Sequence, residues 1–116
     1  MPTIKAIVTL EDIGNAMVYS KQLAINQDES MWLYYEVATG TTAEAIPITF
    51  ATGIAAVDVF FITSTYAITY FLNGSATAIT LDANGAHLLY GTNVTACTIT
   101  NASGSTAIIR IYVAGT

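Results

Sequence analysis

The residues that could do acid–base, nucleophilic or metal chemistry are few and widely spaced in this chain. His87 is its one histidine and Cys97 its one cysteine. A structural zinc site takes about four ligands, mostly Cys and His, so these two would need carboxylates from distant segments. Ser–His–Asp triads assemble through space, but the sequence contains no Gly-x-Ser-x-Gly elbow. We therefore expect no enzyme, no catalytic residue and no metal or cofactor site, with His87 a strand residue that faces solvent or a neighbouring subunit.

Adjacent carboxylates occur at Glu11-Asp12 and Asp28-Glu29, and either pair could join a calcium shell of about six to eight oxygens. The segment Asp82-Ala83-Asn84-Gly85 has the acceptor spacing with which a calcium loop opens, but the acidic ligand that an EF-hand needs downstream is missing. An Asx residue followed by Gly is also typical of a tight hairpin turn, which is the interpretation we adopt. Three sequences match the glycosylation pattern Asn-x-Ser/Thr, and we interpret these as turns as well: they begin at Asn73, Asn93 and Asn101.

The composition is that of a charge-poor, apolar chain. Charged residues make up 9% of its 116 residues, hydrophobic residues 53%, and the net charge is −5. Nucleic-acid binding needs a basic face against the phosphates, which Lys5, Lys21 and Arg110 cannot supply. The same shortage of cations argues against anionic membrane surfaces, and no apolar run approaches the ~20 residues of a membrane-spanning helix. The first ten residues lack the basic and long apolar segments of a signal peptide, so secretion is not expected.

Apolar and polar residues alternate with period two through most of the chain, which indicates β-strands. Pro47 has no N–H to donate, so its strand should lie at a sheet edge or a bulge. Short connections favour antiparallel pairing, and the last four strands are typical of a β-meander or a Greek key. The predicted strands cover 3–10, 16–25, 31–38, 46–50, 57–63, 67–72, 76–81, 86–90, 95–100 and 106–113. We predict one all-β domain over 1–116: an antiparallel two-sheet sandwich of jelly-roll or related Greek-key type, with about eight to ten short strands and no substantial helix.

Two of these strands are apolar on both faces, which predicts a contact on the side turned away from the core. The core side of the strands 31–38 and 106–113 should hold Met31, Leu33, Tyr35, Val37, Ile109, Ile111 and Val113. The residues that we expect at an interface are Trp32, Tyr34, Tyr66, Ile108, Arg110 and Tyr112. Aromatic rings also stack on sugars, so Trp32, Tyr34 and Tyr66 could instead form a glycan-binding platform.

The second half of the chain resembles the small structural proteins of tailed bacteriophages. The resemblance lies in a succession of short Thr/Ala/Gly-rich strands and turns: Phe71-Leu72-Asn73-Gly74, Ala78-Ile79-Thr80-Leu81, the segment from Gly85 to Gly91, Thr98-Ile99-Thr100-Asn101 and Ile109-Arg110-Ile111. Capsid decoration (cement) proteins and the β-domains of head or tail fibres are similar to it in this style and spacing.

The resemblance implies a non-enzymatic component of the virion, made in the host cytoplasm and placed on the capsid surface. It implies the major capsid protein as partner, and a homotrimer around a symmetry axis as the favoured assembly. The alternative that it leaves open is a fibre or spike domain that binds a host glycan or receptor. No individual functional residue is carried across by it.

Overall fold

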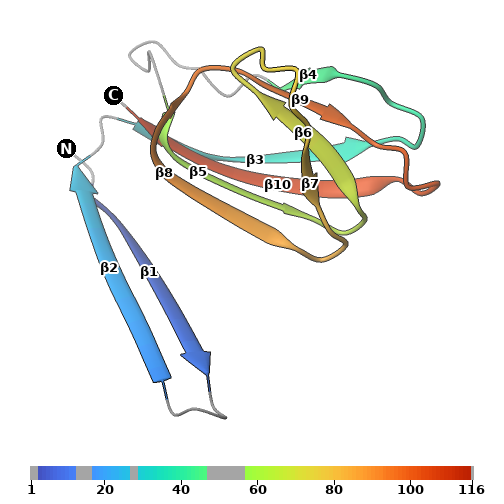
Figure 1. The fold of residues 1–116 in the computed structure, drawn as a ribbon. Coiled ribbons are helices and arrows are strands. Elements are labelled where there is room, and N and C mark those ends of the chain that lie inside the picture. The colour runs from blue at the N-terminus through green and yellow to red at the C-terminus, as the bar shows by residue number, and fades with distance from the viewer. Residues whose placement is uncertain (1–2, 13–16, 27–28, 47–56, 116) are drawn as a thin grey trace.

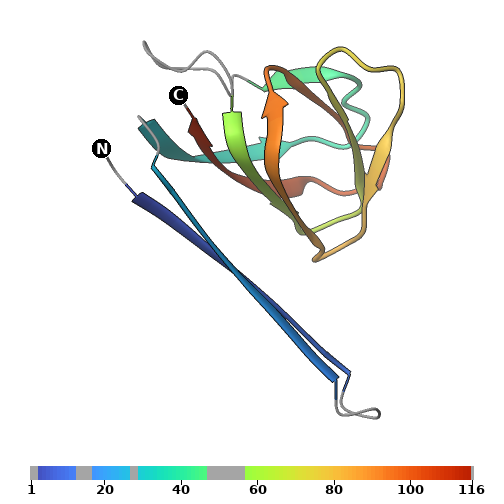
Figure 2. The same cartoon turned by 60° about the vertical axis from the view of Figure 1, so that its left-hand side comes forward.

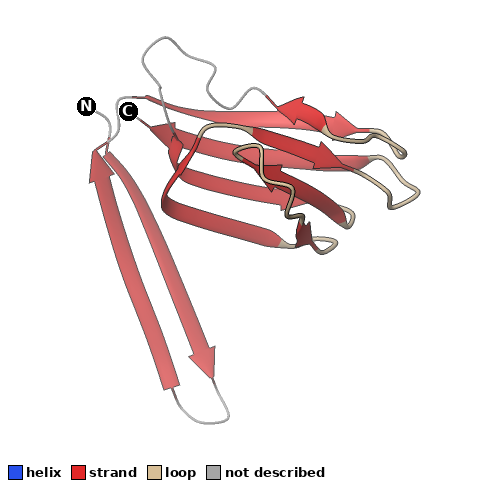
Figure 3. Cartoon of the chain, turned by 45° about the horizontal axis from the view of Figure 1, so that its top comes forward, coloured by secondary structure: helices blue, strands red, loops and turns tan. Residues whose placement is uncertain are grey.

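The computed structural model describes residues 3–12, 17–26, 29–46 and 57–115, and in these residues it is all-β (Figures 1 and 3). No helix in the described residues is long and apolar enough to cross a membrane. The described residues form ten strands: β1 (Thr3–Asp12), β2 (Met17–Asn26), β3 (Glu29–Val37), β4 (Glu44–Ile46), β5 (Val57–Ser64), β6 (Ile68–Leu72), β7 (Ile79–Leu81), β8 (Ala86–Val94), β9 (Cys97–Thr100) and β10 (Ala107–Gly115). The all-β prediction is confirmed. The predicted strand 46–50 is seen only as its first residue, at the end of β4, because 47–50 lie outside the described residues.

Eight strands form a sandwich of two four-stranded antiparallel sheets, in the orders β3-β10-β5-β8 and β4-β9-β6-β7 (Figures 1 and 2). The strands pair as in one long hairpin that bends between β6 and β7. In it, β3 pairs with β10, β4 with β9, β5 with β8 and β6 with β7. Folding this hairpin over adds β10–β5 in one sheet and β6–β9 in the other. This is the jelly-roll arrangement, so the sandwich prediction is confirmed and the β-meander is excluded. β4 lies at a sheet edge, while Pro47 itself lies outside the described residues.

The core lies between the two sheets and is built by alternation along each strand. In β10, Ile109, Ile111 and Val113 are fully buried, as the sequence predicted, while Arg110 between them is exposed. In β5, Phe60 faces inward, and its ring centroid lies 6.2 Å from that of Tyr70 in β6 of the other sheet. One cluster of buried apolar side chains therefore joins both sheets.

β1 and β2 form a two-stranded sheet of their own, with ten residue pairs from Thr3↔Asn26 to Asp12↔Met17. Figures 1 and 2 show this ribbon extending away from the sandwich. The sequence predicted both strands but contained no sign that they would stand outside the two sheets. That 1–116 is a single domain stays a prediction.

The predicted turns are only partly hairpin turns. Asn73 and Gly74 have φ of 55° and 70°, and the Ser75 N–H donates to Leu72 O at 3.0 Å, so they form a type I′-like turn in the β6–β7 hairpin. Asp82–Gly85 is also a turn, closed by the Gly85 N–H to Asp82 O at 2.9 Å, but it leads from β7 in one sheet to β8 in the other. The hairpin interpretation of this segment was therefore wrong.

The other two Asn positions differ from a hairpin in different ways. Asn93 lies inside β8 with a φ of 57°, where β5 and β8 pair with a register shift. Asn101 starts the crossover from β9 to β10, which lie in different sheets. Asn suits position 93 because it tolerates a positive φ, and position 101 because of its side-chain hydrogen bonds, so neither position depends on hairpin formation.

Asn101 is fully buried and every polar group of it is used. Its Nδ2 donates to Val37 O and to Ser105 O, both at 2.8 Å. Its Oδ1 accepts from the Ser103 N–H at 3.0 Å and from Ser103 Oγ at 2.7 Å. Its backbone N–H donates to Thr41 O at 2.9 Å. The residue thus ties the β3–β4 connection to the β9–β10 connection at one end of the sandwich.

Candidate functional site

The outer face of the β3-β10-β5-β8 sheet carries a continuous row of large apolar side chains. The register places Tyr112 opposite both Trp32 and Phe61, and Phe61 opposite Leu88, so one residue from each strand joins the row. The Trp32 and Tyr112 ring centroids are 5.0 Å apart, and Phe61 meets Trp32 edge-on at 6.4 Å. Trp32 is nevertheless 62% exposed. Phe61, Leu88 and Tyr112 are half-buried, so the row is a formed surface whose most exposed part is Trp32.

A second, more polar row lies beside the first. Arg110 is opposite both Tyr34 and Thr63, and the guanidinium carbon lies 5.9 Å from the Tyr34 ring centroid. The Tyr34 hydroxyl donates to Glu36 Oε1 at 3.2 Å. Cation–π contact and the hydrogen bond hold these side chains against the sheet, which lowers the entropy lost when a partner binds. The two rows and their neighbours are called the aromatic face below: Trp32, Tyr34, Glu36, Phe61, Leu88, Ile108, Arg110 and Tyr112.

Five of the six residues predicted for an interface are gathered on this face: Trp32, Tyr34, Ile108, Arg110 and Tyr112. Tyr66 is exposed but lies in the turn after β5, where its carbonyl accepts from Ser64 Oγ at 2.7 Å. The sequence interpretation missed Phe61 and Leu88. Because side chains alternate between the two faces of a strand, Phe61 could have been assigned to the outer face once Phe60 was assigned to the core. Leu88 and Leu89 are adjacent and equally apolar, so the sequence does not indicate which of the two faces outward.

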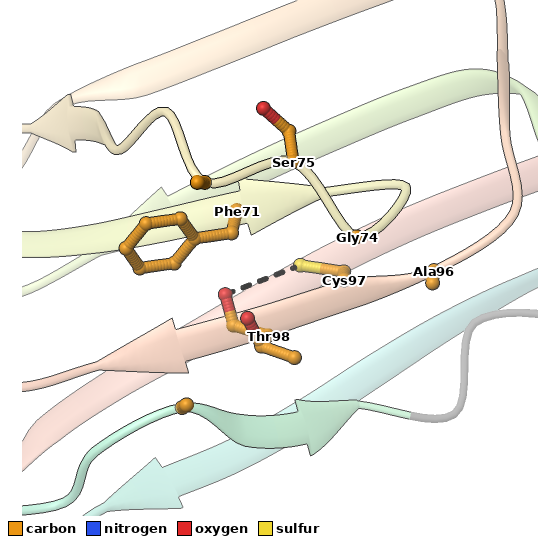
Figure 4. Close-up of a pocket in the computed structure, with 8 residues that line it drawn as sticks. Phe71, Gly74, Ser75, Ala96, Cys97 and Thr98 are labelled. Atoms are coloured by element: carbon orange, nitrogen blue, oxygen red, sulfur yellow. Dashed lines mark hydrogen bonds between the residues drawn. The ribbon is translucent and has the colours of Figure 1, made fainter.

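The outer face of the second sheet is different in chemistry. Thr69 of β6 is opposite both Thr80 and Thr100, which forms a threonine row across three strands. Beyond it, a shallow hollow of about 420 Å³ lies between Phe71, Ser75, Ala96 and Thr98 (Figure 4). Its lining contains no charged side chain. The sandwich therefore has one outer face with a threonine row and an uncharged hollow beside Phe71, and one aromatic face.

His87 is not where the sequence interpretation placed it. It is opposite Ile62 in the inner row of β8, and its Nδ1 is 2.7 Å from the hydroxyl of buried Tyr70. The expectation that His87 faces solvent or a subunit was wrong, because the Tyr70 hydroxyl inside the sandwich needs a hydrogen-bond partner. The pair links the two sheets.

The remaining candidates for chemistry do not come together in the described parts of the chain. Residues 3–12, 17–26, 29–46 and 57–115 contain no group of three His, Cys, Asp or Glu side chains placed to hold a metal ion. Glu11 and Asp12 belong to β1, Glu29 begins β3, and Asp28 lies outside the described residues. Cys97 is buried in β9, and burial raises the pKa of its thiol to about 12. A thiol with such a pKa is a poor nucleophile at neutral pH.

Stability is expected to fall steeply at alkaline pH. Burial, with a smaller contribution from Cys97, raises the pKa of Tyr70 to about 12, as burial does for Cys97 itself. In the unfolded chain the pKa values are lower, near 10 for the tyrosine and 8.5 for the cysteine. The folded state is therefore favoured by both protonated groups in full below about pH 8.5, and this contribution is lost as the pH rises towards 12. We expect a loss of roughly 4–5 kcal/mol in the free energy of unfolding by pH 11, measured by urea denaturation. The double variant Tyr70→Phe/Cys97→Ala should lose clearly less over the same range; an equal loss would contradict this assignment.

No family model and no curated protein matches the chain.

Proposed function

We propose that this chain is a non-enzymatic structural protein of a tailed-bacteriophage virion, which decorates and stabilises the capsid by binding the major capsid protein as a homotrimer. The observation that carries the proposal is the aromatic face, an open sheet surface with exposed Trp32 and Tyr34. Small-molecule sites are concave and enclose their ligand, whereas large exposed side chains on an open sheet face suit a protein surface. Aromatic residues and Arg are also the side chains that dominate binding energy at protein interfaces.

The second support is the low charge of the chain. A decoration protein stands on a lattice in many copies at close spacing, where a small number of charged side chains limits the electrostatic interaction between neighbouring copies. Only 9% of the residues are charged, and the threonine row provides a polar outer face without adding charge. A protein with these two faces can turn the aromatic one towards partners and the threonine one towards solvent. Binding to the assembled shell alone then stabilises the shell by mass action.

The proposal is tested on purified particles of the phage that encodes the chain. We expect peptide mapping to find the chain in DNA-filled heads, and cryo-electron microscopy to place its sandwich on the shell at symmetry-related positions. Heads produced with Trp32→Ala should carry fewer copies and should lose DNA at a lower temperature than wild-type heads. Phe71→Ala, which removes an aromatic side chain from the other outer face, is the matched control. Absence of the chain from the shell would sink the proposal.

A second candidate, a fibre or spike domain that binds a host glycan or receptor, is favoured by one specific observation. The exposed Trp32 and Tyr34 rings lie beside Arg110 and Glu36, which could hydrogen-bond sugar hydroxyls while the rings stack on the sugar. Binding on a glycan array that Trp32→Ala abolishes would support this candidate. An array without binding would leave the capsid proposal as the better one.

A further inference from the structure

The sequence contains the dipeptide Asn-Gly twice, as Asn73-Gly74 and Asn84-Gly85. Asparagine is thermolabile, because the backbone nitrogen that follows it can attack its own side-chain amide. The nitrogen bonds to Cγ, the side-chain NH₂ leaves with the proton of that nitrogen as ammonia, and the product is a cyclic succinimide. Water then opens the ring to aspartate or to isoaspartate, in which the main chain runs through Cβ and Cγ. A following glycine leaves the attacking nitrogen most accessible, since it has no side chain.

The side chain of Asn73 is tied to another part of the fold. Its Oδ1 accepts from the Thr95 N–H at 2.7 Å, from Thr95 Oγ1 at 3.1 Å and from the Ala96 N–H at 3.3 Å. Its Nδ2 donates to Asn93 O at 3.3 Å. These partners lie at the end of β8 or between β8 and β9, whereas the attacking nitrogen lies in the β6–β7 turn. Attack on Cγ therefore has to disturb four hydrogen bonds that fix the amide.

Asn84 lies in an exposed turn between the two sheets. Among the residues that the structure describes, its side-chain amide has no hydrogen-bond partner, and only its backbone N–H is used, by Ser64 O at 2.8 Å. The attacking nitrogen of Gly85 donates to Asp82 O at 2.9 Å, which is the one bond that the attack breaks. We propose that Asn84 is a site of spontaneous deamidation in the folded chain, and that the fold protects Asn73. This inference concerns the chain itself and does not rest on the capsid proposal.

Isoaspartate at position 84 would lengthen the main chain by one carbon atom where the turn is tightly packed. A Cβ added at Gly85 would lie 2.9 Å from Asp82 O and 3.1 Å from Leu81 Cδ1. Leu81 belongs to the core, and the bond from the Asn84 N–H to Ser64 O joins this turn to the end of β5. Isoaspartate is therefore expected to break the hydrogen bond between Gly85 and Asp82 and to loosen the crossover from β7 to β8.

The negative charge of the products has a smaller effect than the longer main chain. Asn84 and Arg110 line the same hollow of about 210 Å³. Arg110 is the only Lys or Arg in residues 29–46 and 57–115, so a carboxylate at position 84 is added on the side of the one cation of the sandwich. Attraction between the two charges offsets the cost of a further negative charge in this acidic chain. Aspartate at position 84 should thus be tolerated, while isoaspartate should not.

The first test compares the two sites in one sample. The purified chain is incubated at about pH 8, below the range in which the fold loses stability. Peptide mapping by mass spectrometry then follows deamidation at both sites. We expect Asn84 to react at least about tenfold faster than Asn73, because fewer hydrogen bonds oppose the attack. In the urea-unfolded chain the two rates should be similar, since glycine follows both. Equal rates in the folded chain would overturn the proposal. Faster reaction at Asn73 would do so too, by showing that the donors around its Oδ1 activate the carbonyl.

The second test separates the modification from other ageing. Asn84→Gly removes the reactive amide and keeps the turn, because glycine adopts the φ of 58° without strain. Asn84→Asp carries the charge without the longer main chain. We expect the isoaspartate fraction of the aged wild-type chain to melt about 5 °C lower than the fresh chain, while aged Asn84→Gly and fresh Asn84→Asp keep their melting temperatures. If Asn84→Gly lost stability on ageing as the wild-type chain does, the reactive site would lie elsewhere and the proposal would be wrong.

Discussion

Replacing Asn101 by aspartate is expected to lower the free energy of unfolding by roughly 3 kcal/mol or more. The new carboxylate oxygen would face the carbonyls of Val37 and Ser105, which now accept hydrogen bonds from Nδ2 at 2.8 Å. Each buried group left without a partner costs about 1–3 kcal/mol, and burying the carboxylate adds to this. For a domain of this size the melting temperature should drop by more than about 12 °C. The deficit should shrink at low pH, where the carboxyl is protonated and can again donate.

Asn73→Asp is the matched control for this substitution. Asn73 is exposed, and its Oδ1 accepts from the Thr95 N–H at 2.7 Å, from Thr95 Oγ1 at 3.1 Å and from the Ala96 N–H at 3.3 Å. Its Nδ2 makes only one bond, 3.3 Å long, to Asn93 O. An aspartate keeps the three accepted bonds, so we expect a loss below about 1 kcal/mol. Equal losses at the two positions would show that burial of Asn101 does not decide its role.

Phe60→Ala is expected to destabilise the chain by about 3–5 kcal/mol. Phe60 is fully buried in β5 and packs towards Tyr70 of the other sheet, so its removal leaves a cavity where the two sheets meet. The measurement is chemical denaturation at neutral pH. A marginal domain with a total stability of about 5–15 kcal/mol would lose much of it through this one substitution.

Phe61→Ala, the next residue along the same strand, serves as its control. Phe61 faces outward and is only half-buried, with Trp32 edge-on beside it. We expect a loss of about 1 kcal/mol in stability, since Phe61 lies on the outer face of the sheet. If Phe61→Ala destabilised the monomer more than Phe60→Ala, the inward and outward faces of β5 would be assigned the wrong way round.

The strands and most of their faces could be predicted from the sequence because alternation with period two is a local property. Ile109, Ile111 and Val113 are buried while Arg110 is exposed, and Trp32 and Tyr34 are exposed, as predicted. Alternation fails in β8, where Leu88 and Leu89 are adjacent and His87 precedes them. Only the Tyr70 hydroxyl in another strand decides that His87 faces inward. That partner is 17 residues away in sequence, beyond the reach of a local pattern.

Connectivity could not be predicted for a related reason. Asp82–Gly85 contains the residues that a tight turn needs, and it forms one, but turn chemistry does not state which sheet takes the next strand. That choice depends on which faces the flanking strands must bury. The same holds for the aromatic face, whose row draws one residue from each of four strands. Trp32 and Tyr112 could be proposed singly from the sequence, but their contact follows from the β3–β10 pairing.

The position of β10 also governs when this sandwich can form during synthesis. β10 lies between β3 and β5, and its residues 107–115 pair with residues 29–37 on one side and with β5 on the other. Until the ribosome has released residue 115, β3 and β5 cannot be joined, and both wait with open edges and uncovered apolar faces. Pairings between such distant segments also make folding slow, on the scale of about milliseconds to seconds. The nascent chain is therefore most exposed to aggregation, and most dependent on chaperones, in the interval before its central strand arrives.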